Sequence, residues 1–187
     1  MSRWKPIVVL LAAGVCTACG DGPAPPPPPP CDEACRDGVA LKGMRETMKL
    51  VFNLTLQGKP VGTYDVPIDC IEGGSARISG TATSNAVQGA TEVDLTYVFD
   101  RCGYLQKDDD ADDSYSLTLT GTVTQRGTLA VQPSATTALV MKGTLSITGT
   151  VYDPPEAYDA IDCPVDVLQN GNRLGGRICT REAGADL

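Results

Sequence analysis

Residues 139–151 read Leu-Val-Met-Lys-Gly-Thr-Leu-Ser-Ile-Thr-Gly-Thr-Val, and this stretch decides the fold class. Its odd positions carry leucine, methionine, isoleucine, valine or glycine, whereas the even positions after Val140 carry lysine, threonine or serine. A period of two is typical of a strand with one face on a core and the other in water. Such half-solvated strands belong to antiparallel sheets, because parallel sheets are covered on both faces. The stretch therefore predicts an antiparallel sheet.

The same alternation occurs in two earlier segments. Their apolar positions on one face are Val93, Leu95, Tyr97 and Phe99 in the first and Leu117, Leu119 and Val123 in the second. Gly-Thr pairs at residues 80–81, 121–122 and 149–150 recur in the strands, at a spacing too uneven for a repeat architecture. Glycines inside strands mark bends or bulges. We therefore expect a curved sheet of about six to eight strands.

Residues 38–57 are predicted to form a helix that precedes this sheet. Apolar residues recur there at helical spacing: Ala40, Met44, Met48, Val51 and Phe52. Asp37 is a suitable N-cap, and the Gly-Lys-Pro sequence at 58–60 is the stop expected after a helix. Gly43 and the alternation of leucine and phenylalanine over residues 50–56 compete with this prediction, but the stop signal favours the helix.

Together these elements predict an α+β fold. We expect residues 37–187 to form a single domain in which the N-terminal helix packs on the curved antiparallel sheet. A closed antiparallel β-barrel is the alternative.

Residues 1–18 have the features of a secretory signal peptide. Arg3 and Lys5 form a basic tip, residues 7–15 form an apolar core, and small residues precede the expected cut. The apolar run is shorter than the about 20 residues that a transmembrane helix needs. The sequence therefore predicts export of a chain that begins at residue 19.

The cut site, with Thr17 and Ala18 before Cys19, resembles the lipobox of bacterial lipoproteins. Cys16 stands where that family usually has leucine, and the resemblance covers only residues 1–20. It implies that Cys19 is the lipidated N-terminus, carrying several acyl chains such as palmitate, because a single chain anchors only marginally. Gly20, in place of aspartate, resembles lipoproteins sent to the outer membrane of the cell envelope. The alternative is a secreted protein with Cys19 as a thiol.

Residues 19–36 are expected to be the lipidated N-terminus and a proline-rich tether. The unbroken run from Pro25 to Pro30 favours an extended polyproline II rod, which spans about 30 Å over residues 20–30. Such a run is alternatively a ligand for an aromatic-lined groove. After cleavage, thirteen basic and twenty-three acidic residues remain, a formal net charge of −10. This charge excludes a nucleic-acid partner and leaves the lipid anchor as the only attachment to the membrane.

Six cysteines follow the lipidation site, and an even number in an exported chain predicts three disulfides. They are Cys31, Cys35, Cys70, Cys102, Cys163 and Cys179. A zinc site is the competing interpretation, but the chain has no histidine and no pair of Cys-x-x-Cys motifs.

Hairpin geometry narrows the fifteen pairings that six cysteines allow. A hairpin of residues 75–83 and 91–99 that turns at 84–88 pairs residues whose numbers add to 172. In that register Cys70 lies opposite Cys102, which predicts a disulfide between them.

A second hairpin is predicted to turn at Asn170-Gly171. A two-residue turn would place Cys163 opposite Ile178, whereas a turn of residues 170–172 with a glycine bulge places it opposite Cys179. We therefore predict Cys163–Cys179, and Cys31–Cys35 remains by elimination.

An acidic loop at residues 106–114 is the one candidate for a metal. Asp108, Asp110 and Asp112 alternate as calcium ligands do in an EF-hand loop, but the central glycine and distal glutamate of that loop are absent. Weak calcium binding is the functional interpretation, and a solvated loop is the favoured one.

The sequence indicates no catalytic apparatus and no cofactor. Without histidine the usual general base is missing, and no nucleophile elbow, phosphate loop or dinucleotide fingerprint is present. A carboxylate pair can act on glycans without histidine, but acids are plentiful on any acidic surface.

Two non-catalytic functions are therefore expected. The first is a membrane-anchored structural or binding module that presents loops to an envelope protein or a glycan. The alternative is a carrier of a lipid or small hydrophobic ligand between helix and sheet, because glycines in apolar strand faces leave room there. The whole chain resembles the many small bacterial lipoproteins with no known activity.

Overall fold

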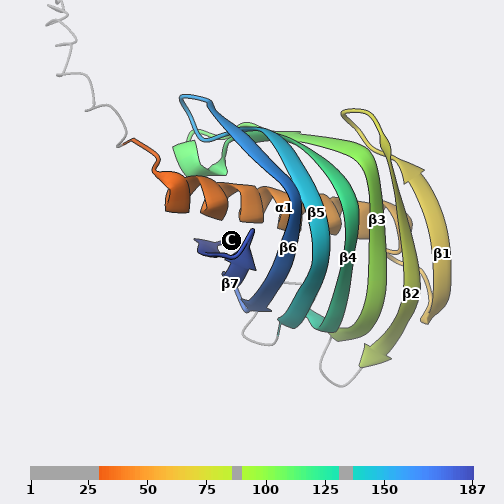
Figure 1. The fold of residues 1–187 in the computed structure, drawn as a ribbon. Coiled ribbons are helices and arrows are strands. Elements are labelled where there is room, and N and C mark those ends of the chain that lie inside the picture. The colour runs from red at the N-terminus through yellow and green to blue at the C-terminus, as the bar shows by residue number, and fades with distance from the viewer. Residues whose placement is uncertain (1–29, 86–89, 131–136) are drawn as a thin grey trace, which may run out of the picture.

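The computed structural model describes residues 30–85, 90–130 and 137–187, in which one long helix lies in the trough of one curved sheet (Figure 1). The helix is α1 (Glu33–Thr55), and a 3-10 turn, η1 (Ala111–Asp113), precedes the fourth strand. The strands are β1 (Gly62–Asp69), β2 (Ser75–Asn85), β3 (Ala90–Gln106), β4 (Tyr115–Ala130), β5 (Ala138–Val151), β6 (Glu156–Asn170), β7 (Arg173–Ile178) and β8 (Arg181–Asp186).

Each strand pairs antiparallel with the next along the chain, so that the sheet runs in the order β1 to β8. Among the described residues β1 and β8 are its two edges, and they do not pair with each other. The predicted α+β fold with an antiparallel sheet is therefore confirmed, and the alternative of a closed barrel is wrong. The sheet stays open because α1 contacts every strand. The helix therefore covers the core face, which in a closed barrel would be covered by strands from the opposite side.

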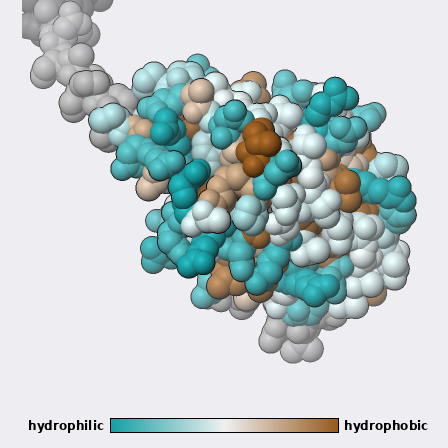
Figure 2. Space-filling view, viewed as in Figure 1, coloured by the Kyte–Doolittle hydropathy of each residue, from teal (hydrophilic) through white to brown (hydrophobic). Residues whose placement is uncertain are grey.

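The two faces of the sheet differ as the alternation predicts. Side chains such as Tyr97, Leu145 and Ile147 are fully buried on the concave face. The outer face carries polar residues, and ion pairs join directly opposite positions such as Asp94 and Arg126 on β3 and β4. Figure 2 shows hydrophilic and neutral residues over most of one side of the molecule, with hydrophobic residues only in small separate groups. The domain therefore has one core, between α1 and the sheet.

Glycine kinks accompany the curvature of the strands. Gly121 in β4 has a φ of 125°, and a Cβ there would lie 2.4 Å from the carbonyl oxygen of Thr144 on β5. Only glycine combines that backbone conformation with so close an approach of the neighbouring strand. The expectation that strand glycines mark bends is confirmed at this position.

The helix begins earlier than predicted. It starts at Glu33, with Asp32 as the N-cap whose side chain accepts a hydrogen bond from the N–H of Cys35 (2.9 Å). Asp37, the predicted N-cap, lies inside the helix and is 1% exposed. Residues 33–36, which we expected in the tether, are therefore helical.

Asp37 forms a buried polar contact with the C-terminal strands. Its carboxylate accepts hydrogen bonds from the hydroxyl of Tyr158 (2.7 Å) and from two nitrogens of Arg181 (2.6 and 2.7 Å). These bonds raise the pKa of Arg181, and burial raises the pKa of Tyr158. The contact ties the first turns of α1 to β6 and β8.

Gly43, which competed with the helix prediction, has a packing role. A Cβ at Gly43 would lie 2.5 Å from a methyl carbon of Leu117 and 3.0 Å from the ring of Tyr115. The glycine therefore lets α1 approach β4 closely, and this approach offsets the cost of glycine inside a helix, about 1 kcal/mol. Within the described ranges, no helix has both the length and the apolar character needed to cross a membrane.

The predicted disulfide pairs are present: Cys31–Cys35, Cys70–Cys102 and Cys163–Cys179. The register that led to the second pair was wrong, because opposite residues of β2 and β3 have numbers that add to 175 instead of 172. Cys70 lies in the turn after β1, outside the ladder. The N–H of Gly103 donates to the carbonyl of Gly73 (2.9 Å), and this bond holds the turn beside Cys102.

The third pair also forms outside the ladder. Asn170 pairs with Arg173, so the turn consists of the two residues between them. The numbers of opposite residues in β6 and β7 therefore add to 343, whereas the predicted three-residue turn gave 342. Cys179 follows the end of β7, and its N–H donates to the carbonyl of Pro164 (3.1 Å). The chain turns there with a φ of 51° at Cys179, which brings its sulfur to Cys163.

Candidate functional site

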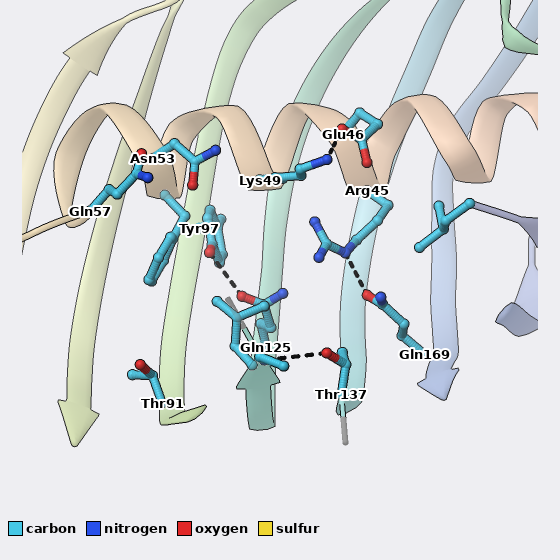
Figure 3. A pocket seen from close by; sticks show the side chains of 14 residues that line it. Arg45, Glu46, Lys49, Asn53, Gln57, Thr91, Tyr97, Gln125, Thr137 and Gln169 are labelled. Carbon is cyan, nitrogen blue, oxygen red and sulfur yellow. Dashed lines mark hydrogen bonds and ion pairs between the residues drawn. The ribbon is translucent and has the colours of Figure 1, made fainter. Parts of the chain in front are cut away.

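A cavity of ≈ 280 Å³ lies between α1 and the concave face of the sheet (Figure 3). Side chains of α1 form one wall, and side chains of β3, β4 and β6 form the wall across from it. Its volume is close to the lower limit of small-molecule sites, about 300 Å³. The cavity is therefore large enough for a small ligand.

The sheet wall carries two glutamines at positions where the alternation predicts apolar residues. Gln125 follows Val123 on the core face of β4, and Gln169 follows Val167 on the core face of β6. The two glutamines are 2% and 3% exposed. An unsatisfied buried amide costs about 1–3 kcal/mol, so both side chains need hydrogen-bond partners.

The helix wall carries a buried arginine. Arg45 lies one turn from Leu41 and Met48, on the face of α1 that packs against the sheet, and is 5% exposed. Burial lowers the pKa of Arg45, and the nearby Glu46 carboxylate partly opposes this shift. The guanidinium stays charged, because the ordinary pKa of arginine is above about 12.

This charge has no ionic partner in the described part of the chain. Glu46, its sequence neighbour, pairs instead with Lys49 (2.9 Å) at the same cavity. The internal segments outside the described ranges, 86–89 and 131–136, contain no aspartate or glutamate. Arg45 is therefore a buried cation without an ion pair among the described residues.

Three hydrogen bonds hold the polar side chains in place. The hydroxyl of Tyr97, which is fully buried, donates to Oε1 of Gln125 (2.8 Å). Nε of Arg45 donates to Oε1 of Gln169 (2.6 Å), whose Nε2 donates to the carbonyl of Gly171 (2.9 Å). Burial raises the pKa of Tyr97, so its hydroxyl keeps the proton that it donates.

At the buried end of the cavity, the network uses the glutamine acceptors and leaves donors. Both Oε1 atoms accept a bond, whereas the two Nη groups of Arg45 and Nε2 of Gln125 have no acceptor among the described residues. Figure 3 shows the end of the Arg45 side chain pointing across the cavity toward Gln125. The site is therefore suited to a ligand that presents hydrogen-bond acceptors.

The acidic loop, by contrast, is not assembled as a calcium site. Oδ1 of Asp108 accepts hydrogen bonds from the N–H groups of the next two residues (2.7 and 3.4 Å). Asp112 and Asp113 pair with Lys42 of α1, at 3.7 Å for Asp112. Within the described ranges, no three acidic, histidine or cysteine side chains are placed to hold a metal ion. The carboxylates of Asp108 and Asp112 are thus used within the loop and on Lys42, and calcium binding by Asp108, Asp110 and Asp112 stays a prediction.

The other predicted features fall partly outside the structure. Cys19, the expected site of lipidation, and the signal peptide lie outside the described residues. The cavity does lie between helix and sheet, where a carrier would hold its ligand. Its innermost residues are polar, however, whereas a carrier of hydrophobic molecules would have an apolar lining.

None of the residues of this site was predicted as a functional residue, although the sequence contains a signal for three of them. Gln125 and Gln169 each extend an alternating apolar face by one more inward position, and Arg45 interrupts the apolar face of the helix. A polar residue at a predicted core position means either that the predicted alternation is wrong there or that the fold buries a polar group for a function.

Comparisons with protein-family models, with curated proteins and with solved structures find no match for this chain. The geometry of the cavity and the sequence of the N-terminal region therefore carry the functional proposal.

Proposed function

We propose that this chain is a non-catalytic binding module of the bacterial cell envelope, and that it holds a small polar molecule in the cavity between α1 and the sheet. The observation that carries the proposal is the buried Arg45, which faces this cavity without an ion pair among the described residues. A cation in such a place is expected in a binding site, where the ligand supplies the missing partner.

The energetics favour binding over a purely structural role. An uncompensated buried charge costs several kcal/mol, whereas a hydrocarbon side chain at the same place would add to the core. Gln125 and Gln169 add two more buried polar groups on the opposite wall. A domain that served only as a spacer would gain stability by replacing all three with leucine or methionine.

The location in the envelope is supported by the N-terminal sequence. The signal peptide at 1–18 and the lipobox-like Cys19 indicate a lipid anchor, and residues 25–30 supply a stiff tether. The three disulfides suit an oxidising compartment outside the cytosol. We therefore place the module at the membrane surface, anchored in the outer membrane through Cys19.

The alternative carrier of a lipid or hydrophobic molecule has less support. Phe52 and Leu129 line the cavity, but Arg45 and the two glutamines occupy its buried end. A long acyl chain would leave these groups without partners.

Recovery of a bound molecule from the native protein tests the proposal. The full chain is extracted from bacterial membranes with mild detergent, purified without denaturant and then unfolded, and the released small molecules are identified by mass spectrometry. We expect one small molecule in amounts close to that of the protein, and much less from the Arg45→Met variant. Equal, trace amounts from both proteins would contradict a binding function.

A further inference from the structure

Arg45 also indicates the chemical class of the ligand, an inference that rests on the proposed binding function. We propose that the cavity binds a small organic monocarboxylic acid, with the carboxylate on the Nη groups of Arg45 and on Nε2 of Gln125. The geometry favours this class because the donors of Arg45 and Gln125 have no acceptor among the described residues, while the Oε1 atoms of both buried glutamines already accept a bond. A planar guanidinium fork matches the two oxygens of a carboxylate.

The charge of the cavity points to a monoanion. Arg45 and Lys49 are the basic side chains that line the cavity, and Glu46 is the acidic one. Lys49 is already paired with Glu46, which leaves Arg45 as the cation available to a ligand. A phosphate carries nearly two negative charges at neutral pH, so Arg45 alone would leave part of its charge without a partner.

The rest of the cavity favours an acid with a short apolar body. Phe52 of α1 and Leu129 of β4 are partly buried and line the same space as Arg45. The volume of ≈ 280 Å³ limits this body to a small molecule.

Binding to the full chain, purified in detergent and freed of bound molecules by dialysis, tests the proposal. The probes are butyrate, hexanoate and benzoate, the primary amides of the same three acids, and inorganic phosphate. We expect at least one acid to bind roughly tenfold or more tightly than its amide, because a hydrogen-bonded charge pair is lost in the amide. Phosphate is expected to bind more weakly than that acid.

The variants separate Arg45 from the general positive charge. Arg45→Met is expected to weaken binding of the acid roughly ten- to a hundredfold, and Arg45→Lys by an intermediate factor, because lysine keeps the charge and loses the fork. Arg126→Met, which removes a positive charge from the exposed outer face, is the matched control and is expected to change the affinity by less than about threefold, because its exposed ion pair with Asp94 contributes little.

Each other outcome overturns a defined part of the account. Equal binding of acids and amides, or equal loss in Arg45→Met and Arg126→Met, would overturn the carboxylate inference and leave the cavity as a binding site. Tighter binding of phosphate would replace the carboxylate by a phosphate ligand. No binding of any probe, together with no molecule recovered from the native protein, would overturn the inference and the proposed function together.

Discussion

Arg45 is a charged side chain at a position where packing alone would favour a hydrocarbon. Its 5% exposure leaves it largely without hydration, and its hydrogen bond to Gln169 replaces only part of what water would supply. A hydrocarbon at this position would therefore favour stability, whereas the charge of Arg45 favours binding.

Replacing Arg45 with methionine should stabilise the ligand-free domain. We expect the free energy of unfolding of Arg45→Met to rise by about 1–2 kcal/mol, because substituting a buried ion by a hydrocarbon of similar size is neutral or stabilising. Denaturant unfolding followed by circular dichroism measures this change. The control is Arg126→Met on the exposed outer face, expected within about 0.5 kcal/mol of the parent. A loss of more than about 2 kcal/mol in Arg45→Met would show that Arg45 is a structural tie instead.

Three buried tyrosines should make the domain sensitive to alkali. Burial raises the pKa of Tyr97, Tyr115 and Tyr158 above the ordinary value. Their contribution to stability is complete below about pH 10, the pKa in the unfolded chain, and is lost as the pH rises above it. Ultraviolet absorbance and circular dichroism, recorded along one alkaline titration, should show these three ionising only as the fold is lost. Ionisation of all six tyrosines in a still-folded domain would contradict this expectation.

At the level of helix and strands, the buried contact of Asp37 with Arg181 and Tyr158 should matter far more than the ion pairs on the outer face. We expect Asp37→Ala to lower the free energy of unfolding by about 2–3 kcal/mol, because it removes hydrogen bonds to a charged group. Asp94→Ala, which breaks an exposed pair with Arg126, should cost less than about 1 kcal/mol. Thermal unfolding of both variants measures the difference. Equal losses would show that Asp37 does not hold α1 to the C-terminal strands.

The same residues show why element boundaries were only partly predictable. Asp32 and Asp37 are both suitable N-caps, and the choice depends on Arg181, far along the chain, which binds Asp37 and leaves Asp32 to cap the helix. Strand periods were predictable because alternation is local. The two hairpin registers were wrong, by three and by one in the sums of opposite residue numbers, because each register depends on the geometry of its turn. The disulfide pairs were correct because the turns at Cys70 and Cys179 bring these residues beside Cys102 and Cys163 despite such shifts.

For the whole domain, the fold class followed from the sequence but the cavity did not. An alternating face predicts a core side without saying whether the sheet closes on itself or curves around a helix. The cavity requires α1, β4 and β6 to meet, and Arg45 is separated from Gln169 by more than a hundred residues. Long-range packing of this kind leaves only an indirect trace in the sequence, namely polar residues at core positions.

The lipid anchor is predicted to depend on one of two nearby cysteines. Cys19→Ala should move the protein from the membrane fraction to the soluble fraction, because the acidic domain has no electrostatic attraction to the membrane. Cys16→Ala is the matched control and should leave it in the membrane. Fractionation of cells producing each variant, with intact-mass analysis of the parent, measures this. Membrane retention of Cys19→Ala would contradict the proposed anchor.

A crystal structure of the protein purified without denaturant tests the binding site most directly. The account predicts electron density for a small planar group about 3 Å from the Nη atoms of Arg45, in the space that Gln125 closes on the far side. A cavity that holds only water, or an Arg45 side chain turned out to solvent, would contradict it.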